Sequence, residues 1–583
     1  MPRVYYWSAS VPFAEVGLYL RFIQPANFMY KQVRILLVCA VSFAAGAFVT
    51  SNDDPKQPLT AEMADVASKV FGLSFTRAER DSMLDNLNDQ RRDFETIRTV
   101  KLTNDVAPAL YFNPLPAGFA LPTGASSFKA SAPGQVRMPA SRDDLAFYTV
   151  AQLGELVRTR QITSEALTQF FLTRLKTYGP ALFNVVTLTE ELALQQARRA
   201  DTEIKAGKYR GPLHGIPYGA KDLLARRGYK TTWGSVPYKD QVLDYDATVI
   251  KRLEDAGAVL CAKLAMGELA MGDVWFGGKS RNPWKSEMGS SGSSAGSGST
   301  VAAGLLPFAI GTETLGSIVS PSTVCGTTGL RPTYGRVSRH GAMALSWSMD
   351  KIGPMTRSVE DCALVFNAIQ GPDNLDLTVM NVPFRYAPLA SLKGVRIGIV
   401  QKAFDGEYPN KANDKATLDV LQKLGATLVP IELPAFRYGA LTMIIGIEGA
   451  AAFDELTRSG RDSLMVRQVK AAWPNEFRSS RFIPAVEYLQ ANRIRTQLIN
   501  QMHEVLKKAQ VDVYISPTYA GGNLTLTNLT GHPCVVLPNG FNTQQTLTSI
   551  TINGQLFAEG PMLAVAKAYQ DATNWHQKHP RLN

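Results

Sequence analysis

The spacing of hydrophobic and polar residues near the start of the chain predicts two helices. Residues 60–73 and 76–97 carry apolar side chains at helical intervals. Thr60 and Thr76 precede these runs and are suited to cap the helix N-termini. Both segments are polar overall, so we expect a helical N-terminal extension.

A larger body begins near Asp143, where the helical spacing resumes. Residues 148–179 predict two helices, capped by Thr149 and by either Thr163 or Ser164. Another helix is expected over residues 189–207. The body therefore starts with a run of helices.

After these helices, the pattern predicts a further helix and several short strands. Residues 244–265 predict a helix capped by Asp246, a break at Gly257 and then a strand. Residues 395–400 and 511–516 are continuous apolar runs, typical of strands buried on both faces. Alternating helices and buried strands indicate an α/β fold with a largely internal sheet flanked by helices.

Residues 108–139 are rich in proline, glycine and serine, which is typical of a boundary. We therefore predict three parts. Residues 1–50 form a leader, residues 51–135 a helical extension with a Pro/Gly-rich connector, and residues 136–583 the main domain.

The leader has the pattern of a secretory signal peptide or an N-terminal anchor. Ile35–Val49 is apolar and uncharged, Lys31 and Arg34 precede it, and Ala45–Ala47 fits a small-residue cleavage site. Translation could start at Met29. The run is short for a membrane-spanning helix. We expect cleavage, an extracytoplasmic (periplasmic or secreted) protein and no stable membrane insertion; the alternative is a buried helix or an uncleaved anchor.

Composition narrows the possible functions. Of 583 residues, 45% are hydrophobic and 19% charged, as in globular proteins. The net charge of +11 is spread along the chain without a nucleic-acid-binding motif, so we expect a basic surface and no nucleic-acid partner. The five cysteines and six histidines show neither CxxC nor HExxH spacing. We therefore expect no disulfide framework, no metal site and no cofactor.

The segment Met288–Thr300, "MGSSGSSAGSGST", resembles a flexible linker, but an apolar run comes directly after it. It also contains G-x-S-x-G, which would make Ser294 the nucleophile of an α/β-hydrolase elbow; that motif requires a preceding buried strand, and "SRNPWKSEM" does not predict one. A serine–lysine pair of the β-lactamase type, Ser126 and Lys129, lies in the boundary region without a K-T-G motif.

Together with the residues after it, this segment resembles the amidase signature family. The blocks are "SGSSAGSGSTVAAGLLPFAIGTETLGSIVSPSTVCGTTGLRPTYGRVS", "GPLHGIPYGAKDLLARRGYKTTWGS", "AKLAMGELAMG", "DKIGPMTRSVEDCALVFNAIQGPD" and "NLTGHPCVVLPNGF". They stand at the family's spacing and cover the chain from about Asp143 to its end. The resemblance implies the amidase-signature fold, with a central mixed sheet flanked by helices.

The resemblance also implies a serine–serine–lysine triad. Ser317 aligns with the nucleophile, Ser293 with the bridging serine after a cis peptide bond from Gly292, and Lys221 with the base. A lysine acts as a base only when neutral, so burial must lower its pKa by about three units. The backbone N–H groups of Thr314, Leu315, Gly316 and Ser317 would bind the oxyanion.

Five residues depart from the family pattern. Glu313 replaces an aspartate, Leu315 replaces a glycine and Val319 replaces an arginine. Ser291 and Ala295 each replace a glycine. If position 315 needs a positive φ, leucine would be strained there. The loss of arginine at position 319 favours a neutral or apolar acyl group.

The predicted function is an extracytoplasmic amidase that hydrolyses a small-molecule amide through an acyl-enzyme, with esters or carbamates as further substrates. One alternative is the glutaminase subunit of a tRNA-dependent amidotransferase. Another is a non-catalytic binding protein that keeps the fold. A homo-oligomer is compatible with the sequence.

Overall fold

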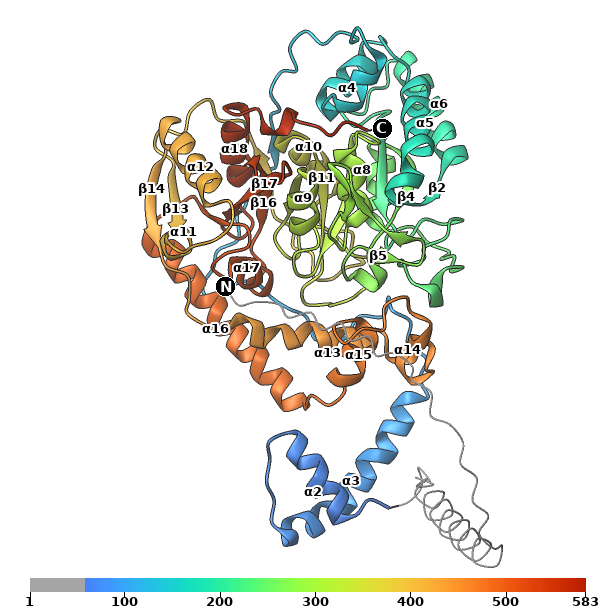
Figure 1. The fold of residues 1–583 in the computed structure, drawn as a ribbon, viewed down its shortest axis with the longest axis vertical. Coiled ribbons are helices and arrows are strands. Elements are labelled where there is room, and N and C mark those ends of the chain that lie inside the picture. The colour runs from blue at the N-terminus through green and yellow to red at the C-terminus, as the bar shows by residue number, and fades with distance from the viewer. Residues whose placement is uncertain (1–57, 583) are drawn as a thin grey trace, which may run out of the picture. The chain divides into compact units, whose positions relative to one another are not determined.

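The computed structural model describes residues 58–582 (Figure 1). The chain divides into two compact units, one up to Val100 and one from Lys101 onward. The predicted signal peptide lies outside the described residues. Within those residues, no helix is both long and apolar enough to cross a membrane.

The first unit contains the two predicted N-terminal helices, α2 (Ala61–Val70) and α3 (Arg77–Arg98). The Thr60 side chain accepts a hydrogen bond from the third residue of α2. Thr76 and Glu79 form a reciprocal capping box at the start of α3. The predicted helices and both predicted caps are confirmed.

Three helices of the second unit confirm the helical spacing: α4 (Val150–Arg158), α5 (Ser164–Leu182) and α6 (Glu190–Lys205). Thr149 caps α4. Of the two cap candidates for α5, Thr163 is the N-cap, and its side chain accepts from the backbone of Ala166.

The predicted cap of the next helix is wrong. Helix α7 spans Thr248–Asp255, and its N-cap is Ala247, which makes no side-chain hydrogen bond. Asp246 instead binds the side chain of Arg226 and the backbone of Arg227. These two partners fix the carboxylate away from the helix start.

The second unit is built on a mixed sheet in the order β14-β13-β15-β17-β16-β10-β11-β9-β3-β4-β2. β3 pairs in parallel with β4 and β9, whereas β9 is antiparallel to β11. The strands are β2 (Val185–Leu188), β3 (Pro217–Lys221), β4 (Val259–Leu264), β9 (Phe308–Glu313), β10 (Thr328–Arg331), β11 (Lys351–Thr356), β13 (Arg396–Val400), β14 (Thr427–Ile431), β15 (Val513–Pro517), β16 (Cys534–Phe541) and β17 (Leu547–Gly554). The predicted apolar runs near residues 395 and 511 form β13 and β15, inside this sheet.

Helices surround the sheet, and the long α16 extends along one end of the unit beside α13 (Figure 1). The remaining helices are α8 (Ala295–Ala302), α9 (Val319–Cys325), α10 (Val359–Ile369), α11 (Gln401–Asp405), α12 (Lys411–Lys423), α13 (Met443–Ala452), α14 (Asp454–Arg458), α15 (Trp473–Ser480), α16 (Ala485–Ala509), α17 (Asn523–Thr530) and α18 (Glu559–Asp571). The short strands are β1 (Ser127–Phe128), β5 (Val274–Trp275), β6 (Gly278–Lys279), β7 (Arg281–Asn282), β8 (Lys285–Gly289) and β12 (Arg385–Tyr386). This is the predicted α/β architecture with a helical N-terminal extension.

The Pro/Gly-rich connector groups with the second unit rather than with the N-terminal helices. Its strand β1 pairs in parallel with β12. Ser126 accepts a hydrogen bond from the backbone of Phe384, and both Ser126 and Lys129 are exposed. The serine–lysine pair of the connector is therefore part of a surface strand pairing.

Candidate functional site

Lys221 is the last residue of β3, and its side chain is fully buried. Its Nζ lies 2.8 Å from Ser293 Oγ, 3.1 Å from Ser294 Oγ and 2.9 Å from Thr312 Oγ1. Burial lowers the pKa of Lys221 to about 7, against a smaller opposing effect of Asp350 and Glu313. A large share of this lysine is therefore neutral near neutral pH and has a lone pair to accept a proton.

The two serines beside Lys221 differ in what their hydroxyls can do. Ser294 Oγ donates to the Thr312 carbonyl at 3.1 Å and accepts from the Thr312 N–H at 3.1 Å. Because the Ser294 proton is held by a carbonyl, that hydroxyl can only accept from Lys221. Among the described residues, the Ser293 hydroxyl forms a hydrogen bond with Lys221 alone. Its proton is therefore free to reach the Lys221 lone pair. This geometry disfavours Ser294 as an elbow nucleophile.

The glycine- and serine-rich segment is packed core, which excludes the linker interpretation. All eight residues of α8 are buried. The peptide bond from Gly292 to Ser293 is cis, as the family resemblance implied. A Cβ at Gly292 would lie 1.8 Å from the carbonyl oxygen of Gly272. The small residues are therefore required by close backbone contacts around Ser293.

Ser317 lies in the turn between β9 and α9 and is buried. Its carbonyl accepts a hydrogen bond from the Ser294 N–H at 3.1 Å, which ties this turn to the segment that carries Ser293. In the described part of the chain, the Ser317 hydroxyl forms no hydrogen bond with protein. The N–H groups of residues 314–317 likewise donate to no protein acceptor within residues 58–582. These free groups are what a nucleophile and an oxyanion hole require.

Glu313 replaces the family's aspartate without disturbing this turn. Its carboxylate accepts the N–H groups of Ile318 and Val319, each at 2.9 Å. Its other oxygen binds Arg331 at 2.7 Å and Asn528 at 2.8 Å. Burial alone would raise the pKa of Glu313, but the Arg331 charge and these hydrogen bonds hold it at about 2. The longer side chain therefore closes the turn and reaches a buried cation.

The structure removes the concern about leucine at position 315. The positive φ of this turn, 85°, belongs to Gly316 and not to Leu315. The unusual residue is Ser291, which has a φ of 59° at a position where the family has glycine. The backbone cost of departing from the family pattern is therefore at Ser291.

Val319 does not contact substrate space in this structure. It is fully buried and packs with Cys534, Val536 and Leu524. Where the family has arginine, this chain has valine, so position 319 carries no positive charge and its side chain contributes to the core. The neutral or apolar acyl group therefore stays a prediction from the sequence.

Two carboxylates that the sequence reasoning missed, the buried Asp222 and the half-buried Asp350, also support the site. Asp222, next to Lys221, pairs with Lys263 at 2.9 Å, with both side chains fully buried. Asp350 accepts the Thr314 hydroxyl at 2.6 Å and the N–H of Leu345 at 2.8 Å. The position of Asp222 directly after the predicted base could have pointed to it. No local pattern could have pointed to Asp350, because its partner Thr314 is 36 positions away.

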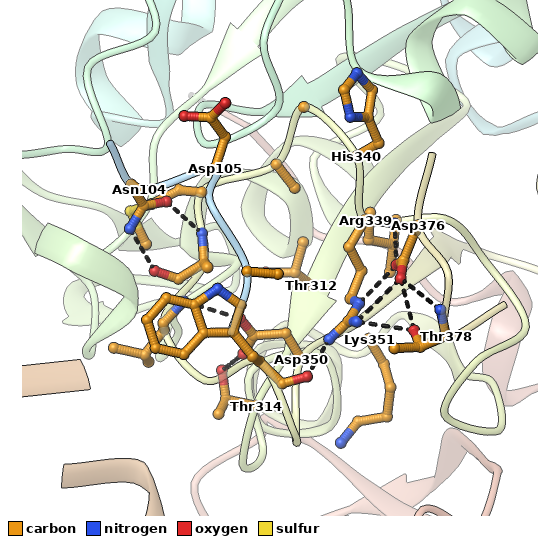
Figure 2. A pocket seen from close by; sticks show the side chains of 18 of the residues that line it. Asn104, Asp105, Thr312, Thr314, Arg339, His340, Asp350, Lys351, Asp376 and Thr378 are labelled. Atoms are coloured by element: carbon orange, nitrogen blue, oxygen red, sulfur yellow. Dashed lines mark hydrogen bonds and ion pairs between the residues drawn. The ribbon is translucent and has the colours of Figure 1, made fainter. Parts of the chain in front are cut away.

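A cavity of about 310 Å³ adjoins this centre through Thr312 and Thr314, whose side chains contact Lys221 and Asp350. Ser293 and Ser317 do not line it. Figure 2 shows Asn104 and Asp105 on one side of the cavity and Arg339 and His340 on the other. The cavity is within the usual range for a small-molecule site.

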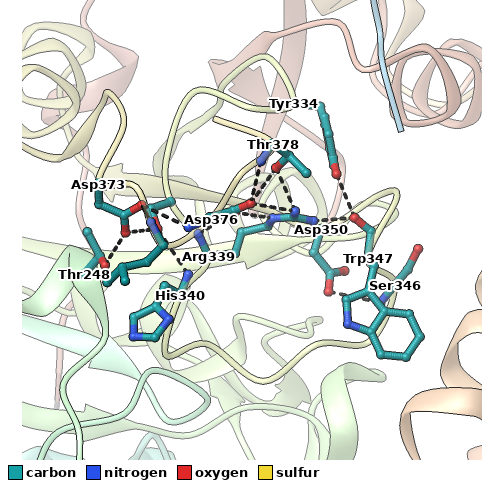
Figure 3. A network of polar contacts seen from close by, with 12 residues as sticks. Thr248, Tyr334, Arg339, His340, Ser346, Trp347, Asp350, Asp373, Asp376 and Thr378 are labelled. Atoms are coloured by element: carbon teal, nitrogen blue, oxygen red, sulfur yellow. Dashed lines mark hydrogen bonds and ion pairs between the residues drawn. The ribbon is translucent and has the colours of Figure 1, made fainter. Parts of the chain in front are cut away.

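The charged Arg339 side chain at the cavity already interacts with other groups of the protein. Figure 3 shows Arg339 between Asp376, which it pairs with at 2.9 Å, and the carbonyl of Trp347. Lys351 is buried, and burial holds the pKa of its amine well below the ordinary value. The Arg339 guanidinium is therefore already paired with Asp376, and burial disfavours the charged form of Lys351. Among the described residues, no cluster of His, Cys, Asp and Glu has the geometry of a metal site.

A family model described as "Amidase" matches residues 166–559, well over half of the chain. The protein belongs to the amidase family. Solved structures with the same architecture include two similar proteins. The amidase is similar to the peptide amidase of Stenotrophomonas maltophilia, with 28% identity and a TM-score of 0.65 over 74% of this chain and 97% of that one. An amidase family protein from Bacillus anthracis has 26% identity and a TM-score of 0.68 over 76% of this chain and 93% of that one.

Curated relatives of this amidase carry a more specific name. The A-subunit of glutamyl-tRNA(Gln) amidotransferase from Coxiella burnetii is 35% identical over 482 residues, which cover 74% of this chain and 99% of the relative. The corresponding amidotransferase protein from Moorella thermoacetica is 34% identical over 75% of this chain and 99% of its own length. About a quarter of this amidase lies outside these matches.

Proposed function

We propose that the protein cleaves amide C–N bonds through an acyl-enzyme on Ser317, with Ser293 as proton bridge and Lys221 as base. The observation that carries this proposal is the 2.8 Å contact between Lys221 Nζ and Ser293 Oγ, at a lysine whose pKa burial lowers to about 7. General base catalysis requires a neutral amine within hydrogen-bond reach of the proton it takes.

The proposed reaction proceeds as follows. Neutral Lys221 accepts the Ser293 proton while Ser293 accepts the Ser317 proton, and Ser317 Oγ attacks the amide carbonyl carbon. The N–H groups of residues 314–317 stabilise the negative oxygen of the tetrahedral intermediate. The C–N bond then breaks, and the departing amine takes the proton back from Lys221 through Ser293. Water, activated by the same relay, hydrolyses the acyl-enzyme and releases the carboxylic acid.

Two forms of this chemistry are compatible with the family. A self-contained amidase would act on small amides, and the same acyl-enzyme would also serve esters or carbamates. A glutaminase subunit would release ammonia from glutamine for a tRNA-dependent amidotransferase. The names and 35% identity of the curated relatives favour the second form. The valine at position 319, where the family has arginine, lies in the core and does not decide between the two forms.

An assay of ammonia and amine release separates these forms. The purified protein is incubated alone with glutamine, with neutral primary amides and with anilides, and Ser317→Ala serves as the control. Turnover of neutral amides without glutamine supports the self-contained amidase. Turnover of glutamine, raised by addition of the other amidotransferase subunits, supports the glutaminase form. Folded protein without any turnover contradicts the catalytic proposal and favours a binding protein.

An extracytoplasmic location is a separate part of the proposal and depends only on the sequence of residues 31–49. The mass of the mature N-terminus, measured on protein from its native host, tests it. Cleavage after Ala47 supports export, and an intact leader on protein from the cytoplasmic fraction contradicts it.

A further inference from the structure

One wall of the cavity beside Lys221 comes from outside the family match. Residues 104–113, here called the strap, lead into the Pro/Gly-rich connector of residues 108–139, whereas the family model begins at residue 166. Asp105, Ala107, Pro108, Leu110 and Tyr111 of the strap line the cavity together with Thr312 and Thr314. This wall is therefore an addition of this chain to the common amidase body.

The strap is fixed at both ends. Asn104 donates from its side-chain amide to the Ala344 carbonyl at 2.9 Å and accepts from the Ala344 N–H at 2.7 Å. At the other end, the Phe112 ring lies 5.0 Å from the Tyr334 ring, and the Arg495 guanidinium lies 3.5 Å above it. Two anchors of different chemistry therefore fix the ends of the strap, and Figure 2 shows the first of them, Asn104, at the cavity.

Between these anchors the strap carries large, exposed apolar side chains, and apolar residues of another loop line the same cavity. Leu110 is 70% exposed and Tyr111 56%, while Leu375 is 59% and Leu377 70% exposed. All four line the same cavity. Large exposed apolar side chains that gather at one concave site mark a ligand or partner surface.

The charges around the cavity agree with an uncharged occupant. Arg339 is paired with Asp376, and Asp350 is bonded to Thr314 and to backbone N–H groups. Of the two cationic side chains that the described residues place in the cavity wall, Arg339 is paired and Lys351 is an unpartnered amine whose pKa burial holds well below its ordinary value. The Asp105 carboxylate at the rim would repel an anionic ligand. Thr312 lines the cavity and also contacts Lys221, so the cavity adjoins the proposed base and the substrate itself is its occupant in this proposal.

We infer that the strap forms a specificity subsite, in which Leu110 and Tyr111 bind a large neutral apolar group attached to the scissile amide. The inference rests on the proposed amidase function and names its substrate class: amides with an alkyl or aryl group of several carbons. Leu375 and Leu377 form the facing wall. The strap residues act on substrate selection and take no part in the bond-breaking steps.

Two homologous substrate series test this inference. One series lengthens the acyl chain of p-nitroanilides from acetyl to octanoyl, and the other lengthens the alkylamine of acetamides. For the full-length protein, kcat/KM is expected to rise roughly fourfold per added methylene in one series until the cavity is filled. The double variant Leu110→Ser/Tyr111→Ser is expected to lose most of that rise, mainly through KM.

The matched control is Leu102→Ser, because Leu102 is 67% exposed in the same part of the chain but does not line the cavity. Its chain-length dependence should equal that of the unaltered protein. Leu375→Ser/Leu377→Ser changes the opposite wall and should reproduce the effect of the strap variant. All variants are also treated with a small fluorophosphonate, whose reaction with the catalytic serine does not need the subsite.

The outcomes distinguish the inference about the subsite from the proposed amidase function. Normal fluorophosphonate labelling with a flattened chain-length series in both wall variants supports the inference. A strap variant that keeps the full chain-length dependence overturns it, as does an unaltered protein that hydrolyses short amides without any chain-length dependence. If the unaltered protein shows neither labelling nor turnover, the proposed function is contradicted, and the inference that rests on it is contradicted too.

Discussion

The pH dependence of Ser317 reactivity tests the role of Lys221. With a pKa of about 7, the neutral fraction of Lys221 is about 0.9 at pH 8 and about 0.01 at pH 5. The rate of labelling by a fluorophosphonate should therefore fall about 90-fold over this interval and reach a plateau above pH 8. The sign follows from the base: protonation removes the lone pair that accepts the Ser293 proton.

The assay measures pseudo-first-order labelling between pH 5 and 10, with circular dichroism at each pH to confirm that the protein is folded. Ser317→Ala gives the background, and Lys221→Met should lower the plateau by about 10²–10⁴-fold and lose the inflection near pH 7. A lysine with its ordinary pKa of 10.5 would instead give a rate that rises tenfold per unit up to pH 10. Either that profile, or the same inflection in Lys221→Met, would refute the assignment of Lys221 as the base.

Three further substitutions test the packing around the site. Glu313→Gln leaves the buried Arg331 without its counter-charge, so chemical denaturation should show a loss of about 3–5 kcal/mol in the free energy of unfolding; a loss below about 1 kcal/mol contradicts the buried pair. Val319→Arg places a cation in an apolar cluster and should destabilise the fold by at least about 3 kcal/mol in the same measurement, and a stable variant that gains turnover of anionic amides would show that this position faces substrate. Gly292→Ala puts a Cβ 1.8 Å from a backbone carbonyl and should abolish fluorophosphonate labelling, whereas Gly439→Ala, which has open space, should label normally; equal labelling of the two would contradict the close packing.

Much of the architecture could be predicted from local patterns in the sequence. Thr60, Thr76 and Thr149 cap their helices because a threonine hydroxyl accepts the orphan N–H groups of the first turn. Asp246 failed as a cap for a reason that no local pattern contains. Arg226 and the backbone of Arg227, about 20 residues earlier, bind its carboxylate.

The candidate site could be predicted only in part. The resemblance placed Lys221 and Ser293 together, and the structure shows the contact between them. The different roles of Ser293 and Ser294 depend on the Thr312 backbone, which belongs to another strand. Sequence spacing likewise cannot show that the strap returns to the cavity, because its anchor Asn104 binds Ala344, 240 positions away.

The central claim is that Ser317 is the nucleophile, and the direct test is to map the fluorophosphonate adduct by mass spectrometry of proteolytic peptides. We expect a single adduct on Ser317 that is lost in Ser317→Ala and strongly reduced in Lys221→Met. An adduct on Ser294 or Ser293 in the unaltered protein, or an adduct on Ser317 that forms equally fast in Lys221→Met, would contradict the account.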